Sequence, residues 1–380
     1  MKELATFIFY KLRLYLFYLL QSTIMHKKLF IPGPTEVRKE VLQEMSHPVI
    51  GHRSSEFSEL HNNTVNKLQK IFNTKSPVFL SGSSALGVME ACARNTIRSG
   101  RKVLNLVCGA FSEKWAKIFK SNGRESIAIE VDWGKATKPE MVREALEKDS
   151  FDAVCLTHNE TSTGVTNPLE EIAKVVKEYP DTLLLVDAVS SLAGIPIKVD
   201  EWGIDVCLAS VQKALAVPPG LAVFSVSEKA LKRAGQVENR GTYFDFLQYL
   251  KYYEKGQTIS TGPISQIFAL SKELDIVLKE SLENRFRRHE KMARKVKEWA
   301  NKNFADFAEQ GYSSKTLTTV KNTKKLDIKE INEELSERGK VISNGYGKLK
   351  DLTFRISHMG EIYPKDIKEL LKDLNEILNL

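Results

Sequence analysis

The chain has 380 residues, 42% of them hydrophobic and 27% charged, which is typical of a globular protein large enough for more than one domain. Its formal net charge of +8 is dispersed, and no compact basic run is interleaved with aromatic residues, so nucleic-acid binding is not predicted. The four cysteines have neither zinc-ligand nor redox C-x-x-C spacing; they are Cys92, Cys108, Cys155 and Cys207. We therefore expect buried free thiols, no metal site and a cytoplasmic location.

Residues 1–24 are an N-terminal extension with two apolar stretches that Lys11 and Arg13 interrupt. The uninterrupted part is too short to span a bilayer as a helix, and no small-residue cleavage site follows it. Three interpretations stay open: an interfacial amphipathic helix, a packing arm, or a product of start-codon choice, since Met25 precedes the first recognisable motif. We expect no membrane association, and a protein tethered to a membrane surface by residues 1–24 is one rival hypothesis.

An arm and two helices are predicted next. Residues 29–35 are Pro-rich and therefore extended, because each X-Pro pair disfavours helix. Helices are expected over residues 37–45 and 56–72. Between them, the pair His52-Arg53 could bind a phosphate or a carboxylate at a helix start, although a capping role is the commoner one.

Strands and helices alternate from residue 78 onward. Apolar runs predict strands at residues 78–80, 103–107, 125–131, 153–156, 183–186, 206–209 and 221–226. Helical patterns lie at residues 88–97, 113–121, 139–147 and 169–178. This order predicts a large α/β domain over residues 25–265, with a mostly parallel, seven-stranded sheet and helices on both faces.

A loop rich in Gly and Ser, residues 81–87, joins the first of these strands to its helix. Backbone N–H groups and the helix dipole at such a junction form an anion site. The loop alone would equally suit a nucleotide-binding α/β protein, which is a second rival hypothesis.

Two further strands end in residues of complementary chemistry. Asp187 stands at the end of the run 183–186, and Lys213 follows the run 206–209. Ligands sit outside the carboxyl ends of parallel strands, so both side chains are expected at one rim of the sheet. A lysine there can form a Schiff base with a carbonyl cofactor, and pyridoxal phosphate also needs an acid that keeps its ring nitrogen protonated.

The motifs around these residues closely resemble the class V (fold-type I) pyridoxal-phosphate aminotransferases, above all the alanine–glyoxylate and serine–pyruvate aminotransferases. They read Pro32-Gly33-Pro34-Thr35, Asp187-Ala188-Val189-Ser190-Ser191, Ser210-Val211-Gln212-Lys213-Ala214-Leu215 and Pro218-Pro219-Gly220. The resemblance covers all but about the first 25 residues.

This resemblance implies roles for individual residues. Lys213 would hold the cofactor, Asp187 would contact its ring nitrogen, and Phe111 would stack on the ring. Arg355 lies on a strand where an unpaired charge is costly, and it would bind the substrate carboxylate rather than form an internal ion pair. Further residues implied in the site are Gly33 near the substrate and, around the cofactor, Thr161, Val189, Gln212 and one or more of Ser83, Ser84 and Ala85.

The segment 238–257 looks irregular and aromatic, and an exposed aromatic loop suggests a protein interface. The resemblance implies that the following Thr261, and more loosely Thr258, bond the cofactor phosphate of a neighbouring subunit. We therefore expect a homodimer with active sites shared across the interface.

The C-terminal part is expected to be a small α+β domain with its linker helix, residues 266–380. One long helix with i,i+4 charge pairs is predicted over residues 264–303. Strands follow at residues 316–320, 341–343 and 352–357, and helices at 328–338 and 365–378.

These features predict a transaminase that uses a Lys213 aldimine. By resemblance, its donor is serine or alanine and its acceptor pyruvate or glyoxylate. His158 and Glu160 are assigned structural roles, because the Schiff-base lysine can itself move the proton. Arg53 leaves an aspartate or aminophosphonate transaminase as the alternative, and a decarboxylase or a lyase also stays open.

Overall fold

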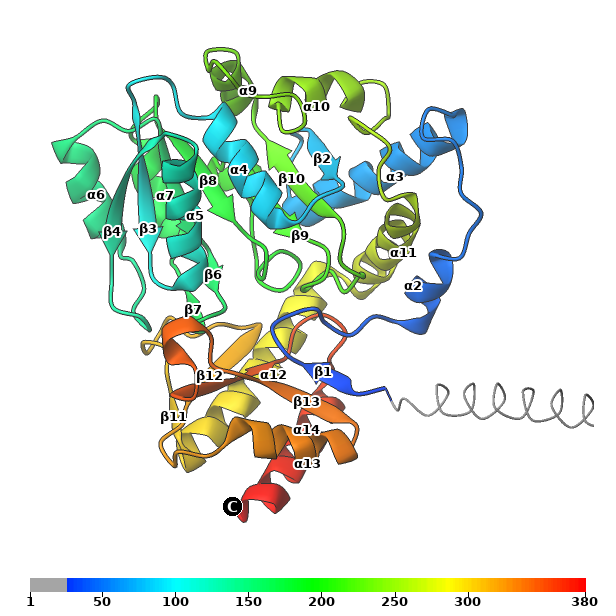
Figure 1. Cartoon of the computed structure of the whole chain (residues 1–380), viewed down its shortest axis with the longest axis vertical. Helices are drawn as coiled ribbons and strands as arrows, with labels where there is room; N and C mark the ends of the chain where they lie inside the picture. Colours follow the sequence, from blue (N-terminus) through cyan, green and yellow to red (C-terminus); the bar gives the residue numbers. More distant parts are fainter. Residues whose placement is uncertain (1–25) are drawn as a thin grey trace, which may run out of the picture.

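A computed structural model describes residues 26–380, which form a larger and a smaller sheet covered by helices (Figure 1). The strands of the larger sheet are β2 (Val78–Ser81), β3 (Lys102–Val107), β4 (Glu125–Glu130), β5 (Ala153–Thr157), β8 (Leu183–Asp187), β9 (Val206–Ser210) and β10 (Ala222–Val226). Their order is β2-β10-β9-β8-β5-β3-β4. Strand β10 runs antiparallel to the six other strands, which all run in one direction. The predicted α/β fold with a mostly parallel, seven-stranded sheet is confirmed.

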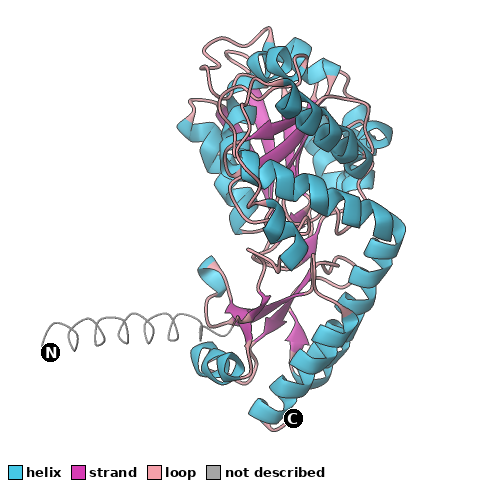
Figure 2. Cartoon of the chain, turned by 90° about the vertical axis from the view of Figure 1, so that its right-hand side faces the viewer, coloured by secondary structure: helices cyan, strands magenta, loops and turns pink. Residues whose placement is uncertain are grey.

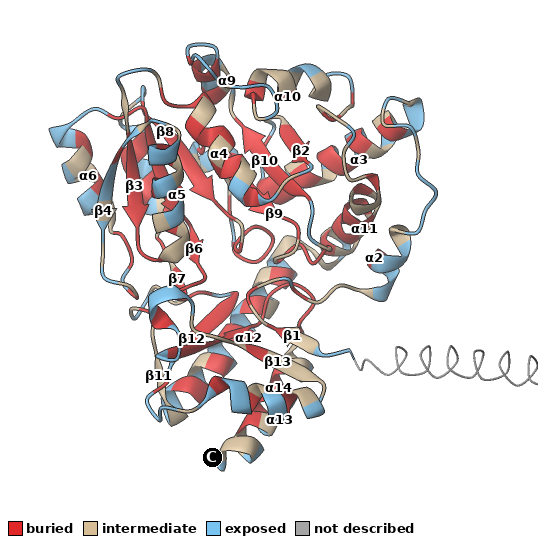
Figure 3. Ribbon diagram, in the orientation of Figure 1, coloured by how far each residue is buried: buried red, intermediate tan, exposed pale blue. Residues whose placement is uncertain are grey.

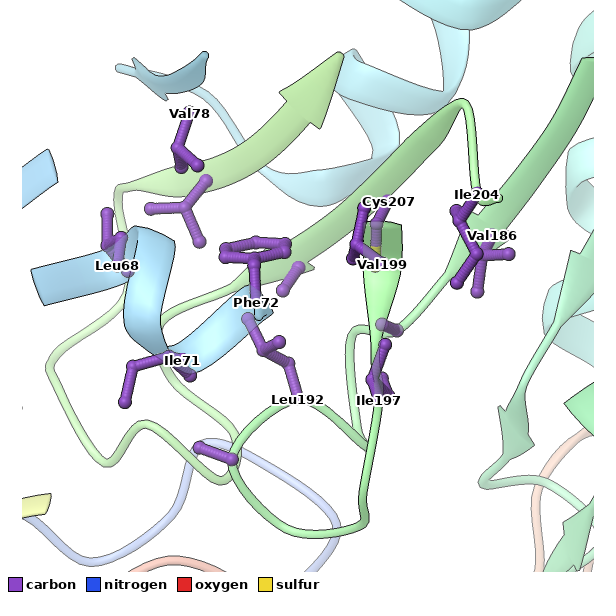
Figure 4. Close-up of a cluster of buried hydrophobic side chains, with 14 of the residues drawn as sticks. Leu68, Ile71, Phe72, Val78, Val186, Leu192, Ile197, Val199, Ile204 and Cys207 are labelled. Atoms are coloured by element: carbon purple, nitrogen blue, oxygen red, sulfur yellow. The ribbon is translucent and has the colours of Figure 1, made fainter. Parts of the chain in front are cut away.

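Helices cover both faces of this sheet because its strands are apolar on both sides. In β8, Leu184 and Val186 join one hydrophobic core, and Leu183 and Leu185 join the other. The first core packs against α3 (Ser55–Phe72), α6 (Pro139–Lys148), α7 (Leu169–Lys177) and α11 (Ile264–Glu280). The second packs against α4 (Ala85–Asn95), α5 (Ala110–Ser121), α9 (Glu228–Ala234) and α10 (Phe246–Tyr253). Figure 3 shows the buried strands between these layers, and Figure 4 shows the part of the first core around Phe72.

The register of the parallel strands brings several strand ends together. Asp187, the last residue of β8, pairs with Thr157 at the end of β5 and with Leu208 of β9. Strand β9 continues to Ser210, and Lys213 follows it. Because β2 runs in the same direction as β9, the loop after Ser81 opens at this same edge. The carboxyl edge therefore gathers the predicted site residues, as in other open α/β sheets.

The smaller sheet has the order β1-β13-β14-β12-β11, and only β1 and β13 in it are parallel. Its strands are β1 (Lys28–Phe30), β11 (Ala305–Asp306), β12 (Leu317–Lys321), β13 (Lys340–Asn344) and β14 (Thr353–Ser357). Helices α12 (Leu282–Asn303), α13 (Ile328–Glu337) and α14 (Pro364–Leu378) pack on it (Figure 2). Strand β1 belongs to the N-terminal arm, so the arm starts in the smaller sheet and then crosses to the larger one. The division into residues 25–265 and 266–380 stays a prediction.

The single long helix predicted over residues 264–303 is wrong, because two helices, α11 and α12, meet at Ser281. This residue has a φ of +67°, which no helix accommodates, and its Oγ accepts a hydrogen bond from the Asn284 N–H. Ser281 therefore caps the start of α12. The i,i+4 charge pairs on both sides of Ser281 are typical of helix, so the sequence pattern did not indicate a break there.

The exposed aromatic loop predicted over residues 238–257 is also wrong in its central part. Residues 246–253 form α10, which buries Phe246 and Tyr249 in the second core. The Tyr249 ring packs edge-on against Phe224, with centroids 5.2 Å apart. Tyr243, just before this helix, is 41% exposed.

The remaining elements are short. They are α2 (Lys39–Glu44), α8 (Val199–Trp202), the strand pair β6 (Asn159–Glu160) and β7 (Val165–Thr166), and the 3₁₀ helix η1 (Gly347–Leu349). The four cysteines are buried free thiols. Across residues 26–380, no helix combines the length and hydrophobicity that crossing a bilayer requires. The interpretations of residues 1–24 concern a segment outside the described residues.

The assignment of α10 to the core can be tested by replacing Phe246 with Ala. This change should lower the free energy of unfolding by about 3–5 kcal/mol, because it removes a fully buried ring. The matched control Tyr243→Ala should cost clearly less, about 1 kcal/mol, since 41% of that residue is exposed. Chemical denaturation measures both. Equally small losses would contradict the assignment.

Candidate active site

A cavity of about 210 Å³ opens at the carboxyl edge of the larger sheet. Its walls come from residues at or after the ends of β5, β8 and β9 and from the first two turns of α4 and α5. The lining residues are Ser84, Ala85, Leu86, Met89, Phe111, Lys114, Asn159, Thr161, Asp187, Val189, Ser190, Gln212 and Lys213. The structure thus brings together most of the residues that the sequence singles out.

Lys213 lies on this wall in the loop after β9. Its Nζ donates a hydrogen bond to the backbone oxygen of Pro32. The pKa of this amine is lowered to about 8, first by burial and then by the positive charge of Arg355, while Asp187 acts in the opposite direction. Neutral amine is therefore more abundant near neutral pH than for an exposed lysine, which favours nucleophilic attack on a carbonyl.

Asp187 faces the same cavity from the end of β8. Its Oδ1 accepts a hydrogen bond from the Val189 N–H at 2.9 Å, and its Oδ2 accepts one from Thr157 Oγ1 at 3.3 Å. Burial raises the pKa of the Asp187 carboxyl to about 7, and the charge of Glu160 acts in the same direction. A cationic ligand group beside Asp187 would return it to the ionised form.

The start of α4 supplies an anion-binding end to the cavity. Ser84 is the N-cap of this helix but makes no side-chain cap bond, and Ser84, Ala85 and Leu86 all line the cavity. The first N–H groups of a helix have no partner within it, so they are available to a phosphate. Ser83 does not line the cavity, and its Oγ bonds Ser81 Oγ at 2.9 Å instead.

Four more predicted residues form the side walls. Phe111 lies in the first turn of α5, and Val189 follows Asp187. Gln212 Oε1 accepts a hydrogen bond from Ser210 Oγ at 2.7 Å. Thr161 is buried, and its backbone oxygen accepts a hydrogen bond from Arg355 Nη1 at 3.2 Å.

Gly33 packs directly against the lysine. Its φ is +133°, and a Cβ added to it would lie 2.5 Å from Lys213 Nζ. A side chain at this position would therefore meet both backbone strain and a clash. The arm is fixed here by Thr35, whose Oγ1 donates to the Lys213 backbone oxygen at 2.7 Å.

Arg355, on β14 of the smaller sheet, is 8% exposed; it does not line the cavity itself but contacts the lining residue Thr161. Its Nε donates to the Asn344 backbone oxygen at 3.0 Å, and its Nη1 to that of Thr161. Burial lowers the pKa of this guanidinium to about 10. No Asp or Glu among residues 26–380 forms an ion pair with it. A buried guanidinium with unused donors suits an incoming carboxylate.

Thr258, Thr261 and Arg53 do not line the cavity. Thr258 Oγ1 donates to the Ser260 backbone oxygen at 2.7 Å, and the exposed Thr261 lies 3.4 Å from His52 Nε2. Arg53 donates to the Thr258 backbone oxygen at 2.7 Å and lies over the Tyr252 ring. Within one chain, Arg53 fixes the segment that carries both threonines.

Glu160 and His158 make the contacts of structural residues. The Glu160 carboxylate accepts hydrogen bonds from Phe111 N, Ser112 N and Ser162 Oγ at 3.1, 3.0 and 2.7 Å. It therefore caps α5, although it comes from β6. His158 is buried against Ser191 Oγ at 3.0 Å, and burial lowers its pKa to about 4.

Sequence reasoning did not assign the lining residues Leu86, Met89, Asn159 and Ser190 to the site, and it missed two residues of more consequence, Lys114 and Tyr346. Lys114 lies one helical turn after Phe111, so the i,i+3 spacing could have revealed it. Tyr346 stacks on Phe111, with ring centroids 5.3 Å apart and an interplanar angle of 21°. Tyr346 comes from a loop of the smaller sheet, and no local sequence pattern predicts its contact with Phe111.

The pH dependence of stability tests the burial of Asp187. The carboxyl pKa is raised from its usual value near 4 to about 7, so the folded chain holds this proton more tightly than the unfolded chain does. Stability should therefore fall as the pH rises from about 4 to about 7, by up to roughly 4 kcal/mol at 1.36 kcal/mol per unit. Denaturation of cofactor-free protein across this range measures it. The variant Asp187→Asn should lack this component, and identical pH slopes for both proteins would contradict the account.

Comparison with known proteins agrees with this geometry. The family model for class-V aminotransferases matches residues 29–347. An uncharacterized aminotransferase of Methanocaldococcus jannaschii is 42% identical over 346 residues, 90% of each chain. A serine–glyoxylate aminotransferase of Methylorubrum extorquens is 33% identical over 350 residues, 88% of this chain and 86% of that one.

The structure is similar to the crystal structure of an alanine–glyoxylate aminotransferase from Nostoc sp. The TM-score is 0.87 at 30% identity, over 93% of this chain and 95% of that chain. The extent of these matches excludes a nucleotide-binding protein that shares only the Ser/Gly loop. The chain belongs to the class-V aminotransferases, and its cofactor is pyridoxal 5′-phosphate.

Proposed function

We propose that this aminotransferase moves an amino group from serine or alanine to pyruvate or glyoxylate, with Lys213 as its catalytic residue. The observation that carries the proposal is the meeting of Lys213 and Asp187 in one cavity. The first turn of α4 and the Arg355 guanidinium stand at its margins. Two of the similar proteins, named serine–glyoxylate and alanine–glyoxylate aminotransferases, support small substrates.

The residues present fit the cofactor. Asp187 is a buried carboxyl whose hydrogen-bond donors are neutral, so a protonated ring nitrogen would complete its environment. The N–H groups at the start of α4 would hold the phosphate. Phe111 and Val189 would contact the faces of the ring, and Thr161 and Gln212 its polar edge.

Pyridoxal phosphate, when bound, supplies an electron sink for the negative charge that develops at the substrate Cα. Lys213 contributes an amine whose lowered pKa leaves it partly neutral, so it can attack the cofactor carbonyl and later accept the Cα proton at Nζ. The Pro32 backbone oxygen accepts a hydrogen bond from Nζ at the cavity wall.

Arg355 orients the substrate. It would bind the substrate carboxylate through its unused guanidinium N–H groups. Its hydrogen bonds to the backbone oxygens of Asn344 and Thr161 hold the guanidinium group in place. The absence of a side chain at Gly33 leaves the Lys213 amine accessible. A proton acceptor, a carboxylate anchor and a carboxyl group for the ring nitrogen would thus be arranged around one bound cofactor and substrate.

The proposal includes a homodimer and a cytoplasmic location. Thr261 is exposed, and Pro263 packs near Gly82, where an added Cβ would lie 3.2 Å from Pro263 Cδ. This places the segment with Thr258 and Thr261 next to the loop before α4 in its own chain. In the proposed homodimer, the hydroxyls of Thr261 and Thr258 would donate hydrogen bonds to the cofactor phosphate of the neighbouring subunit.

An absorption titration tests the central reaction. With cofactor supplied, the protein should show the visible band of a lysine-bound cofactor, lose it with L-serine or L-alanine and regain it with pyruvate or glyoxylate. Lys213→Arg, which keeps the positive charge, should abolish both changes because its guanidinium is no nucleophile at neutral pH. A band in Lys213→Arg that still responds to L-serine would exclude Lys213 as the catalytic residue.

An acidic donor such as aspartate is the second candidate, and Lys114 is the observation that favours it. Lys114 lines the cavity, is exposed, and forms no ion pair with residues 26–380. Its Nζ lies 5.6 Å from the centre of the Phe111 ring. A second cation here could bind the side-chain carboxylate of a dicarboxylic donor.

Replacing Lys114 with Met separates the two candidates. With an acidic donor, kcat/KM for L-aspartate should fall about tenfold or more, because a charge-assisted bond of about 1.5–3 kcal/mol is lost, while the values for L-serine and L-alanine stay unchanged. The exposed Lys117 on the same helix supplies the control Lys117→Met. Wild-type turnover of L-serine far above L-aspartate, with no effect of Lys114→Met on either, would dismiss the acidic donor.

A further inference from the structure

Two aromatic rings and two cations are linked by pairwise contacts between the larger and the smaller sheet. Lys114 Nζ lies 5.6 Å from the Phe111 ring centre, and Phe111 stacks on Tyr346 at 5.3 Å. The Arg355 guanidinium carbon lies 5.6 Å from the Tyr346 ring centre. Tyr346 therefore contacts both the proposed cofactor-stacking ring and the proposed carboxylate-binding arginine.

The loop that carries Tyr346 is held in one conformation by hydrogen bonds. Asn344 Oδ1 accepts from the Gly345 and Asp351 N–H groups at 2.6 and 2.9 Å, and Asn344 Nδ2 donates to Asp351 Oδ1 at 2.6 Å. The Tyr346 backbone oxygen accepts from the Leu349 N–H at 3.1 Å, at the start of η1. A Cβ added to Gly345 would lie 1.9 Å from the Leu349 oxygen, so the turn is tightly closed.

Arg355 is fixed to this same loop, since its Nε donates to the Asn344 backbone oxygen. The guanidinium and the Tyr346 ring thus form one unit, which the stack on Phe111 joins to the larger domain. An aromatic face near a guanidinium stabilises its charge and limits its rotation. The Tyr346 hydroxyl makes no hydrogen bond to residues 26–380, so the ring carries the interaction.

We propose that Tyr346 is a positioning residue that holds the Arg355 guanidinium over the substrate site and sets its affinity for the carboxylate of both substrates. The inference rests on the proposed function, which assigns Arg355 to that carboxylate. Since amino donor and oxo-acid acceptor each present an α-carboxylate, Tyr346 should act on both half-reactions alike.

The experiment compares Tyr346→Ala and Tyr346→Leu, which remove the aromatic face, with Tyr346→Phe, which keeps it. Leu352→Ala is the matched control, because Leu352 lies in the same loop and is 64% exposed. Melting curves and circular dichroism establish that each variant is folded. Tyr346→Ala and Tyr346→Leu have the same expected result. If one of these variants does not fold, the other still tests the role of Tyr346.

Two readouts are measured. In turnover, Tyr346→Ala and Tyr346→Leu should raise KM for donor and acceptor by about tenfold, the factor that 1.4 kcal/mol represents, with kcat changed less than about threefold. In the cofactor-free protein, ligand-observed NMR should show a similar loss of affinity for propionate, an unreactive carboxylate. Arg355→Ala should abolish this binding, while Tyr346→Phe and Leu352→Ala should match the wild type.

The outcomes separate this inference from the proposed function. Unchanged KM and propionate affinity in Tyr346→Ala, or equal losses in Tyr346→Phe, would overturn the positioning role even if transamination proceeds. A loss of propionate affinity confined to the Ala and Leu variants, in a protein that fails to transaminate, would support the role of Tyr346 and reject the proposed reaction.

Discussion

The burial of an acid and an amine at adjacent strand ends is the constraint on which the site depends. Asp187 and Lys213 lie at one edge of a sheet whose strands are apolar on both faces, where Asp187 is buried and Lys213 is half-buried. Burial moves both pKa values toward neutrality, to about 7 for the acid and about 8 for the amine. The desolvation of the two charged forms therefore affects the pKa values more than the attraction between Asp187 and Lys213 does. Neither side chain is held in its charged form by an internal ion pair. Such a pair suits a ligand that brings a cationic ring and a carbonyl carbon.

Buried hydrogen bonds and ion pairs connect the smaller sheet to the Lys213 loop. Arg285, fully buried in α12, donates to the backbone oxygen of Ala214, next to Lys213, at 2.7 Å. It also pairs with Glu280 at 2.9 Å and with Glu361 at 3.2 Å. The Lys213 loop is therefore attached to the helix that supports the smaller sheet, and Arg355 projects from that sheet. The proposed carboxylate anchor and the proposed catalytic amine therefore share one framework.

The sequence predicts much of this arrangement because its strongest signals are physical. Continuous apolar runs predicted the buried strands, and the position of Asp187 and Lys213 after two of them predicted their meeting at one edge. Two predictions failed because of tertiary structure. The helix predicted over residues 264–303 is interrupted by Ser281, which caps the start of α12. The aromatic segment around Phe246 forms a helix because that side chain packs into the hydrophobic core. Tyr346 could not be predicted, since a loop of the smaller sheet brings it to Phe111. The phosphate roles of Thr258 and Thr261 concern a second subunit and stay predictions.

The most direct test of the account is to find the lysine that carries the cofactor. The loaded protein would be reduced with borohydride, digested and analysed by mass spectrometry. The account predicts one reduced cofactor on the peptide that contains Lys213, and none on the peptide that contains Lys114, although both lysines line the cavity. Attachment at Lys114 or at any other lysine would contradict the assignment of Lys213 as the catalytic residue.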